Sequence, residues 1–155
     1  MKISIQTEDF DVGAETADLG RADAGNIPGA VVTFTGLVRD RHAGKQVTAM
    51  TLEHYPGMTE KELTRICGEA MERWPITNVT IIHRVGRLLA ADQIVFVGCA
   101  SPHRDAAFEA ARFMMDFLKT DAPFWKAEET DAGTTWVDAR DSDRSAAARW
   151  HQKNT

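Results

Sequence analysis

The apolar run IVFVGCA, residues 94–100, is the feature that most constrains the fold. A nearly unbroken apolar run rich in β-branched residues predicts a strand that is covered on both faces, at the centre of a sheet. With 155 residues, the chain can bury roughly 70% of the surface that its unfolded form would expose. Because there is no internal repeat or linker-like tract, we expect one domain over residues 1–155.

Four other segments are predicted to be extended. The segment GAVVTFTGLV, residues 29–38, is β-branched and alternates in polarity, which indicates a strand with one buried face. Gly36 permits a bend or bulge near its end. The other extended segments are VTAMTLEHY, residues 47–55, VTIIHRV, residues 79–85, and PFWKAEET, residues 123–130.

A first helix is predicted over residues 59–74. The stretch TEKE matches a capping box in which Thr59 and Glu62 satisfy amides at the helix start. Apolar residues then recur at helical spacing, and Pro75 ends the helix because it disfavours α geometry in the residue before it.

A second helix is predicted directly after the central strand. Ser101 is expected to be its N-cap and Pro102 its first residue, which places His103 and Arg104 in the first turn and Lys119 in the last. A polar helix over about 142–150 is expected near the end of the chain. Since this order lacks regular βαβ alternation, the sequence predicts an α+β fold on mainly antiparallel sheet.

Composition excludes several classes of function. The chain carries 23 acidic and 18 basic residues, and a net charge of −5 argues against general nucleic-acid binding. It has no signal peptide and no apolar run of about 18 residues, so we expect a soluble, cytoplasmic protein that does not bind membranes. Cys67 and Cys99 show no CxxC spacing, and the five histidines form no HxxxH or HExxH pair. We therefore expect two buried, inert thiols, no metal and no cofactor.

Two lysines bracket a proline-containing turn in FLKTDAPFWKAE. Separately, Lys119 and Lys126 would be ordinary surface residues, but a tight turn between them makes a shared cleft plausible. Two nearby cations lower each other's pKa, so one lysine would act as base or nucleophile near pH 7. The aromatic residues Phe34, Phe124 and Trp125 either line this cleft or belong to the core.

Two further basic clusters are candidates for anion binding. His103 and Arg104 beside the free amides of a helix N-terminus predict a site for phosphate or carboxylate, since a purely structural role would favour acidic residues there. The other cluster is Arg39, Arg41, His42 and Lys45. Arg39 follows Gly36 at a strand end, where binding side chains are commonly held, but its spacing fits an ordinary surface arginine equally well.

Several motifs, in this order and spacing, closely resemble the large, catalytic subunit of molybdopterin synthase. They are AVVTFTGLVRD, TLEHYPGMTEKEL, IIHRVGRL, SPHR and DFLKTDAPFWK, and the resemblance covers residues 29–140. It implies an enzyme of molybdenum-cofactor biosynthesis that converts cyclic pyranopterin monophosphate into molybdopterin. Sulfur would come from the C-terminal thiocarboxylate of a small ubiquitin-like subunit. The implied assembly is a central homodimer with one small subunit at each end, and the implied fold is an α/β hammerhead with an added antiparallel sheet.

The resemblance also assigns roles to residues. Arg39 and the backbone of Leu37 and Val38 would contact substrate. Lys119 would be the principal catalytic residue and Lys126 would assist it. The other implied substrate-binding residues are His103 and Arg104, which would hold the phosphate-bearing part from the neighbouring protomer, and Ala127 and Glu128, which would border the pocket.

Two positions depart from the family pattern. Leu37 stands where relatives have a basic or polar residue, and Pro102 replaces a small residue. Two other functions stay open: a non-catalytic adaptor that docks a ubiquitin-like sulfur carrier, and a phosphate-binding hydrolase. The hydrolase ranks last because the sequence offers no evident nucleophile–base pair.

Overall fold

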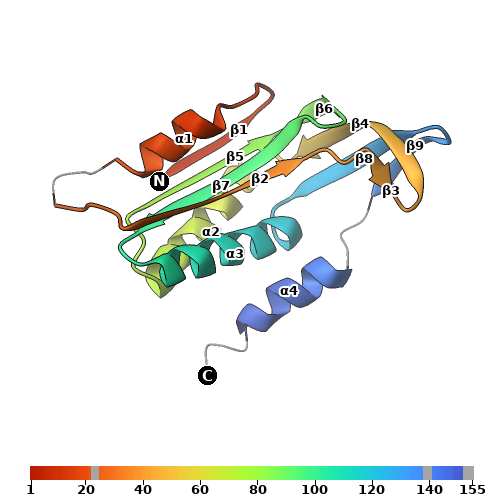
Figure 1. Cartoon of the computed structure of the whole chain (residues 1–155). Coiled ribbons are helices and arrows are strands. Elements are labelled where there is room, and N and C mark those ends of the chain that lie inside the picture. Colours follow the sequence, from red (N-terminus) through yellow and green to blue (C-terminus); the bar gives the residue numbers. More distant parts are fainter. Residues whose placement is uncertain (22–24, 138–140, 152–155) are drawn as a thin grey trace.

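The computed structural model describes residues 1–21, 25–137 and 141–151, and its core is a four-stranded sheet (Figure 1). The strand order is β1-β5-β7-β2, with β1 parallel to β5 and the other pairs antiparallel. The strands are β1 (Lys2–Gln6), β2 (Ala30–Leu37), β5 (Asn78–Arg84) and β7 (Gln93–Ser101).

A second sheet is built entirely from antiparallel pairs. Its order is β3-β4-β8-β9, and β6 pairs with β4 beside this path. The long strand β4 therefore connects most of the sheet. The strands are β3 (Arg41–His42), β4 (Lys45–His54), β6 (Gly86–Leu89), β8 (Phe124–Thr130) and β9 (Gly133–Val137).

Helices cover both faces of the first sheet. Helices α2 (Met58–Arg73) and α3 (Arg104–Thr120) pack on one face, where Val97 and Cys99 of β7 join the main core. Helix α1 (Val12–Leu19) packs on the other, against Phe96. It lies so close that a Cβ on Gly98 would stand 2.5 Å from Cδ1 of Leu19. The central position of the run 94–100 and the α+β class with mainly antiparallel sheet are confirmed.

The predicted capping box of the first helix is wrong. The helix begins at Met58, because Gly57 adopts φ 86° and turns the chain before it. The Gly57 amide donates to the Glu60 carboxylate at 2.7 Å, and the Thr59 hydroxyl donates to the Tyr55 carbonyl at 2.9 Å. The predicted end before Pro75 is confirmed.

The predicted N-cap of the second helix is also wrong. Ser101 pairs with Ala30 and is the last residue of β7, so α3 begins at Arg104 with His103 as its N-cap. Pro102 precedes the helix. The Ser101 hydroxyl instead bridges the chain, since it accepts from the His103 amide at 3.1 Å and donates to the Pro75 carbonyl at 2.8 Å.

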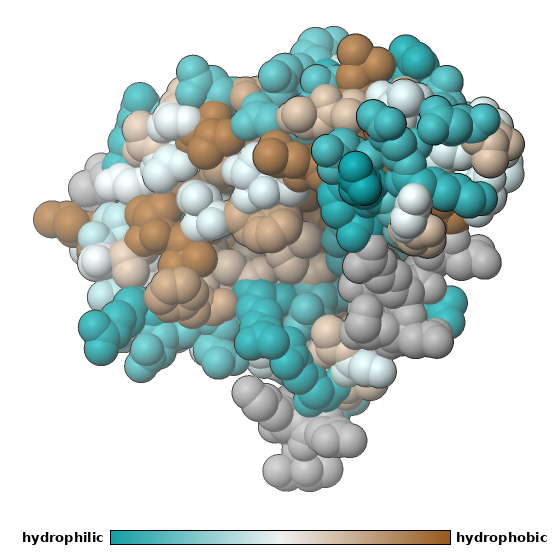
Figure 2. Space-filling view, turned by 45° about the vertical axis from the view of Figure 1, so that its right-hand side comes forward, coloured by the Kyte–Doolittle hydropathy of each residue, from teal (hydrophilic) through white to brown (hydrophobic). Residues whose placement is uncertain are grey.

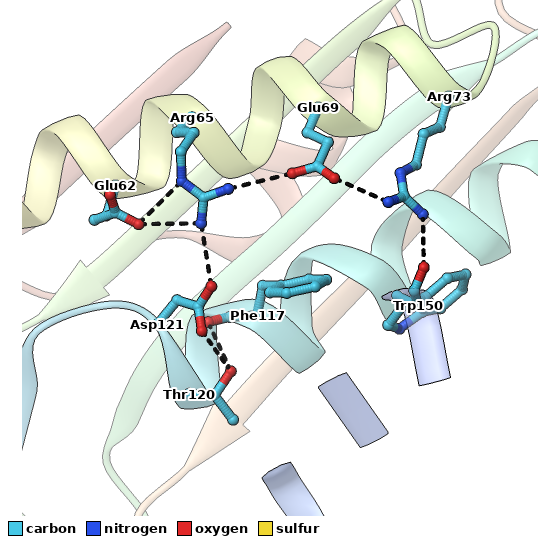
Figure 3. A network of polar contacts seen from close by, with 8 residues as sticks. All are labelled: Glu62, Arg65, Glu69, Arg73, Phe117, Thr120, Asp121 and Trp150. Carbon is cyan, nitrogen blue, oxygen red and sulfur yellow. Dashed lines mark hydrogen bonds and ion pairs between the residues drawn. The ribbon is translucent and has the colours of Figure 1, made fainter. Parts of the chain in front are cut away.

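Helix α4 (Asp141–His151) matches the predicted terminal helix and is anchored by Trp150, which is 2% exposed. The Trp150 indole lies edge-on to Trp74 and Phe113 and donates to Asp116 at 2.7 Å. Figure 3 shows the polar contacts beside it, in which Arg73 of α2 bonds the Trp150 carbonyl.

The same polar network reaches the end of α3. Arg65 of α2 bonds Glu62, Glu69 and Asp121, and Asp121 is the residue that caps α3 (Figure 3). The end of α3 and the turn after it are thereby fixed to α2. Within the described residues, no helix is long and apolar enough to cross a bilayer.

Candidate active site

A cavity of about 360 Å³ opens where the C-terminal end of α3 meets both sheets. Most of its lining is apolar, and exposed Phe34, Leu37 and Trp125 are part of it. On the face shown in Figure 2, apolar residues gather over the left and centre, and hydrophilic residues lie mainly along the lower edge and at the upper right. The charged and titratable residues that line the cavity are Arg39, His83, Lys119, Lys126 and Glu128.

A β-bulge brings Arg39 to this cavity. The register of β2 against β7 shifts between Gly36 and Leu37, as the sequence predicted. A Cβ on Gly36 would lie 2.8 Å from Cγ1 of Val95, so the strand approaches β7 closely there. Beyond the bulge, Leu37 and Arg39 line the cavity and Val38 is buried between them.

The backbone amide and carbonyl of Val38 are both hydrogen-bonded within the chain, which limits their use in binding a ligand. Its amide donates to the Asp92 carbonyl at 2.9 Å, and its carbonyl accepts from the Ala91 amide at 2.8 Å. Its side chain belongs to a small core cluster. A backbone contact with substrate at this position would have to use the second lone pair of the Val38 carbonyl.

The two lysines of the proline-containing turn line the same cavity. Lys119 lies in the last turn of α3 and Lys126 lies on β8. Between them, the Phe124 amide donates to the Ala122 carbonyl at 2.8 Å, which closes the turn. A cation in the last helical turn complements the helix dipole, so the fold tolerates Lys119 there at no electrostatic cost.

Glu128 is a buried carboxylate in this otherwise basic lining. Its Oε2 lies 2.8 Å from Nδ1 of His42, which reaches over from β3. The alternation of β8 places Lys126 and Glu128 on the cavity side and turns Ala127 into the core. Ala127 therefore supports the cavity from behind.

His103 and Arg104 lie at the opposite end of α3. Lys119 follows Arg104 by fifteen positions of helix, which is about 22 Å along the axis. The Arg104 side chain is 86% exposed, and neither residue lines the cavity. Within one chain, Arg39 meets Lys119 and Lys126 at one cavity, whereas Arg41 and Lys45 of its predicted cluster line a different hollow, and His103 and Arg104 stay apart.

Comparison with known proteins places this arrangement in a family. The sequence model of the MoaE protein family matches residues 5–121.

The chain belongs to the MoaE family.

Relatives of known name agree with this assignment. The chain is 56% identical over 149 residues to the molybdopterin synthase catalytic subunit of Escherichia coli, which covers 96% of this chain and 97% of the relative. It is also similar to the solved MoaE protein of Burkholderia ambifaria, with 53% identity, 97% of both chains covered and a TM-score of 0.81. A solved molybdopterin synthase from Staphylococcus aureus is 32% identical over 87% of this chain and 96% of that chain, with a TM-score of 0.79.

Sequence reasoning missed His83 in this MoaE chain. This residue is 5% exposed, lines the cavity and stacks on Phe124, with ring centroids 3.9 Å apart and an interplanar angle of 17°. The pKa of His83 is lowered to about 4, mainly by burial and to a smaller extent by Coulombic interaction with Lys119 and His54, although its hydrogen bond with the Arg84 carbonyl acts in the opposite direction. The signals in the sequence were its place inside the apolar strand VTIIHRV and inside the motif IIHRVGRL.

Proposed function

We propose that this MoaE chain is the catalytic subunit of a molybdopterin synthase. It transfers sulfur from the C-terminal thiocarboxylate of a small ubiquitin-like subunit to cyclic pyranopterin monophosphate, which forms the dithiolene of molybdopterin. The observation that carries the proposal is the convergence of Arg39, Lys119 and Lys126 on one cavity in a net acidic chain. The shared identity with a relative of that name supports it.

The cavity suits a reaction between two anions. Thiocarboxylate and phosphate repel each other, and an apolar lining would make both harder to desolvate. Fixed cations offset this cost, and they act most strongly where water is excluded. Arg39 and Lys126 hold the anions while the thiocarboxylate sulfur attacks the pterin side chain. Lys119 moves protons, or attacks the acyl carbon transiently to release the spent tail.

The third basic cluster serves a neighbouring protomer in this proposal. His103 and Arg104 bind the phosphate-bearing part of a substrate seated in the partner's cavity. Their exposure and their separation from Lys119 support this arrangement. The working assembly is a homodimer of this chain with one small subunit at each end, and we place it in the cytoplasm.

Incubation of the chain with the thiocarboxylated small subunit and cyclic pyranopterin monophosphate tests the proposal. Mass spectrometry should detect the dithiolene product and two spent carboxylates of the small subunit for each dithiolene, because each thiocarboxylate supplies one sulfur atom. An adaptor would bind the small subunit without forming product. A hydrolase would release inorganic phosphate from the precursor whether or not the small subunit is present.

A further inference from the structure

His83 is held in the cavity wall from two sides. Its ring stacks on Phe124, and its Nδ1 lies 2.8 Å from the carbonyl oxygen of Arg84. Since a carbonyl oxygen only accepts hydrogen bonds, Nδ1 carries the proton. In the neutral ring, Nε2 is then an unprotonated acceptor with a fixed direction.

The surroundings of His83 keep the ring uncharged. Burial is the main cause of its lowered pKa; Coulombic interaction with Lys119 on α3 and His54 on β4 lowers it further, and the hydrogen bond with the Arg84 carbonyl only partly offsets these effects. A second proton on the ring would add a buried cation beside these groups. The remaining charged residues of the cavity are Arg39, Lys126 and Glu128.

We propose that His83 is a positioning residue for Lys119, whose Nζ donates a hydrogen bond to the Nε2 of His83 during sulfur transfer. This inference rests on the proposed function and deepens it. The two residues line one cavity, and each comes from a rigid element, β5 and α3. Phe124, whose ring stacks on His83, is the first residue of β8 and directly follows the turn after Lys119, so the stack connects β5 to the segment that follows α3.

A neutral acceptor suits this position better than a carboxylate. An aspartate or glutamate would form an ion pair with Lys119 and cancel the charge that anionic reactants require. An imidazole orients the ammonium group and leaves its charge available. The same uncharged ring can take no proton of its own near neutral pH, so proton transfer stays with Lys119.

Three substitutions separate the roles of the two ring nitrogens. His83→Asn retains a donor near Nδ1 for the Arg84 carbonyl but lacks an acceptor at the Nε2 position. His83→Gln offers its amide oxygen at the Nε2 position and loses the donor to Arg84. His83→Phe keeps the stack on Phe124 and has neither polar atom.

Steady-state kinetics on the full assembly distinguish positioning from packing. Because a hydrogen bond to a charged group is lost, we expect kcat to fall about 10- to 100-fold in His83→Asn and His83→Phe, with KM within about twofold. His83→Gln should recover most of that kcat. A kcat for His83→Phe within about threefold of the parent would show that the ring only packs and would overturn the proposal. Equal losses in all three variants, with a lowered melting temperature, would overturn it as well.

Nitrogen-15 NMR of the full assembly, with the thiocarboxylated small subunit bound and no pterin added, tests the same contact in the state that is ready for sulfur transfer. The imidazole of His83 should show a protonated Nδ1 and a bare Nε2, and Lys119→Met should shift the Nε2 resonance. Lys61→Met, at an exposed position on α2, is the matched control and should shift nothing. An unmoved Nε2 resonance in Lys119→Met would overturn the proposal even if the enzyme makes molybdopterin. A shifted resonance in a chain that makes none would instead contradict the proposed function.

Discussion

The two ends of α3 carry basic residues in opposite settings. At the C-terminal end, Lys119 joins a cavity with Lys126 and Arg39, beside stacked aromatic rings. At the N-terminal end, the Arg104 side chain extends into solvent, 86% exposed, and lies about 22 Å from Lys119. One end lines a cavity within a single chain, and the other presents its charge to solvent.

This difference teaches how a helix can serve two sites. A rigid helix cannot bend its two ends toward one ligand, so residues at both ends act together only if a second molecule faces one of them. In a twofold-symmetric dimer, the N-terminal end of α3 in each chain would face the cavity of the other chain. Substitutions at the two ends of α3 test whether the two ends act in different cavities.

The largest effect is expected from Lys119→Ala. Loss of a group that transfers protons or attacks the acyl carbon should lower kcat by about 10³-fold. Because the side chain leaves the end of a helix and no core position, the melting temperature should change by only a few degrees. Product formation by mass spectrometry and thermal unfolding by circular dichroism measure the two quantities. Lys61→Ala is the control. Full activity in Lys119→Ala would show that Lys119 takes no part in the reaction.

The buried imidazole at this end predicts a pH-dependent stability. The pKa of His83 is about 4 in the fold against an ordinary 6.5, so between these values the unfolded chain binds more protons. Stability is thus fully retained above pH 6.5 and falls as the pH drops, by about 2 kcal/mol from this residue at pH 5.

Urea unfolding at pH 7 and pH 5 measures this effect. Other groups also contribute to the change in unfolding free energy between pH 7 and pH 5. The test is therefore the difference between this change in the parent chain and the same change in His83→Phe. The variant should lose about 2 kcal/mol less than the parent over this range. Identical losses in both chains would show that His83 titrates with its ordinary pKa.

At the exposed N-terminal end of α3, Arg104→Ala should weaken binding of the pterin substrate. Removal of a charged donor to phosphate should raise KM for the pterin substrate about tenfold and leave kcat within about twofold. Arg112→Ala, at another exposed position of the same helix, is the matched control. If KM is unchanged, Arg104 does not hold the phosphate.

The smallest effect is expected in a mixed dimer of one Lys119→Ala chain and one Arg104→Ala chain, purified through two different tags. If the two ends of α3 serve different cavities, one of its two sites is intact, and activity at low substrate should fall only about twofold. If both ends served the same chain, no site would be intact and activity would fall to about one twentieth of the parent value. The second result would contradict the shared site.

The C-terminal end of α3, which lines the cavity, was largely predictable from sequence, because the residues that indicate it are close together in the chain. Pro123 marks the helix end, the two lysines flank the turn, and Gly36 marks the bulge before Arg39. The exposed end was predicted less well. Ser101 has the chemistry of an N-cap, but pairing with Ala30 keeps it in β7, and no local rule reports a strand partner 71 positions away.

Tertiary contacts also explain what was missed elsewhere. The short elements β1, α1, β6 and β9 lack a periodic pattern long enough to identify and are held by their neighbours in the fold. His83 lies within the motif IIHRVGRL, but the ring on which it stacks comes from Phe124, 41 positions later, and no local pattern reports that contact. The separation of His103 and Arg104 from the cavity follows from helix length, yet the sequence alone does not say which cavity they face.

The bulge at Gly36 sets a limit on how this strand can evolve. Val38 and Arg39 are consecutive in the chain, but the Val38 side chain lies in the core and Arg39 lines the cavity. Since strand faces alternate with period two, loss or gain of one residue upstream would exchange them and bury a guanidinium group. Homologous chains can therefore vary the amino acids of this segment far more readily than its length, and an alignment gap here would mark a protein with a different chemistry.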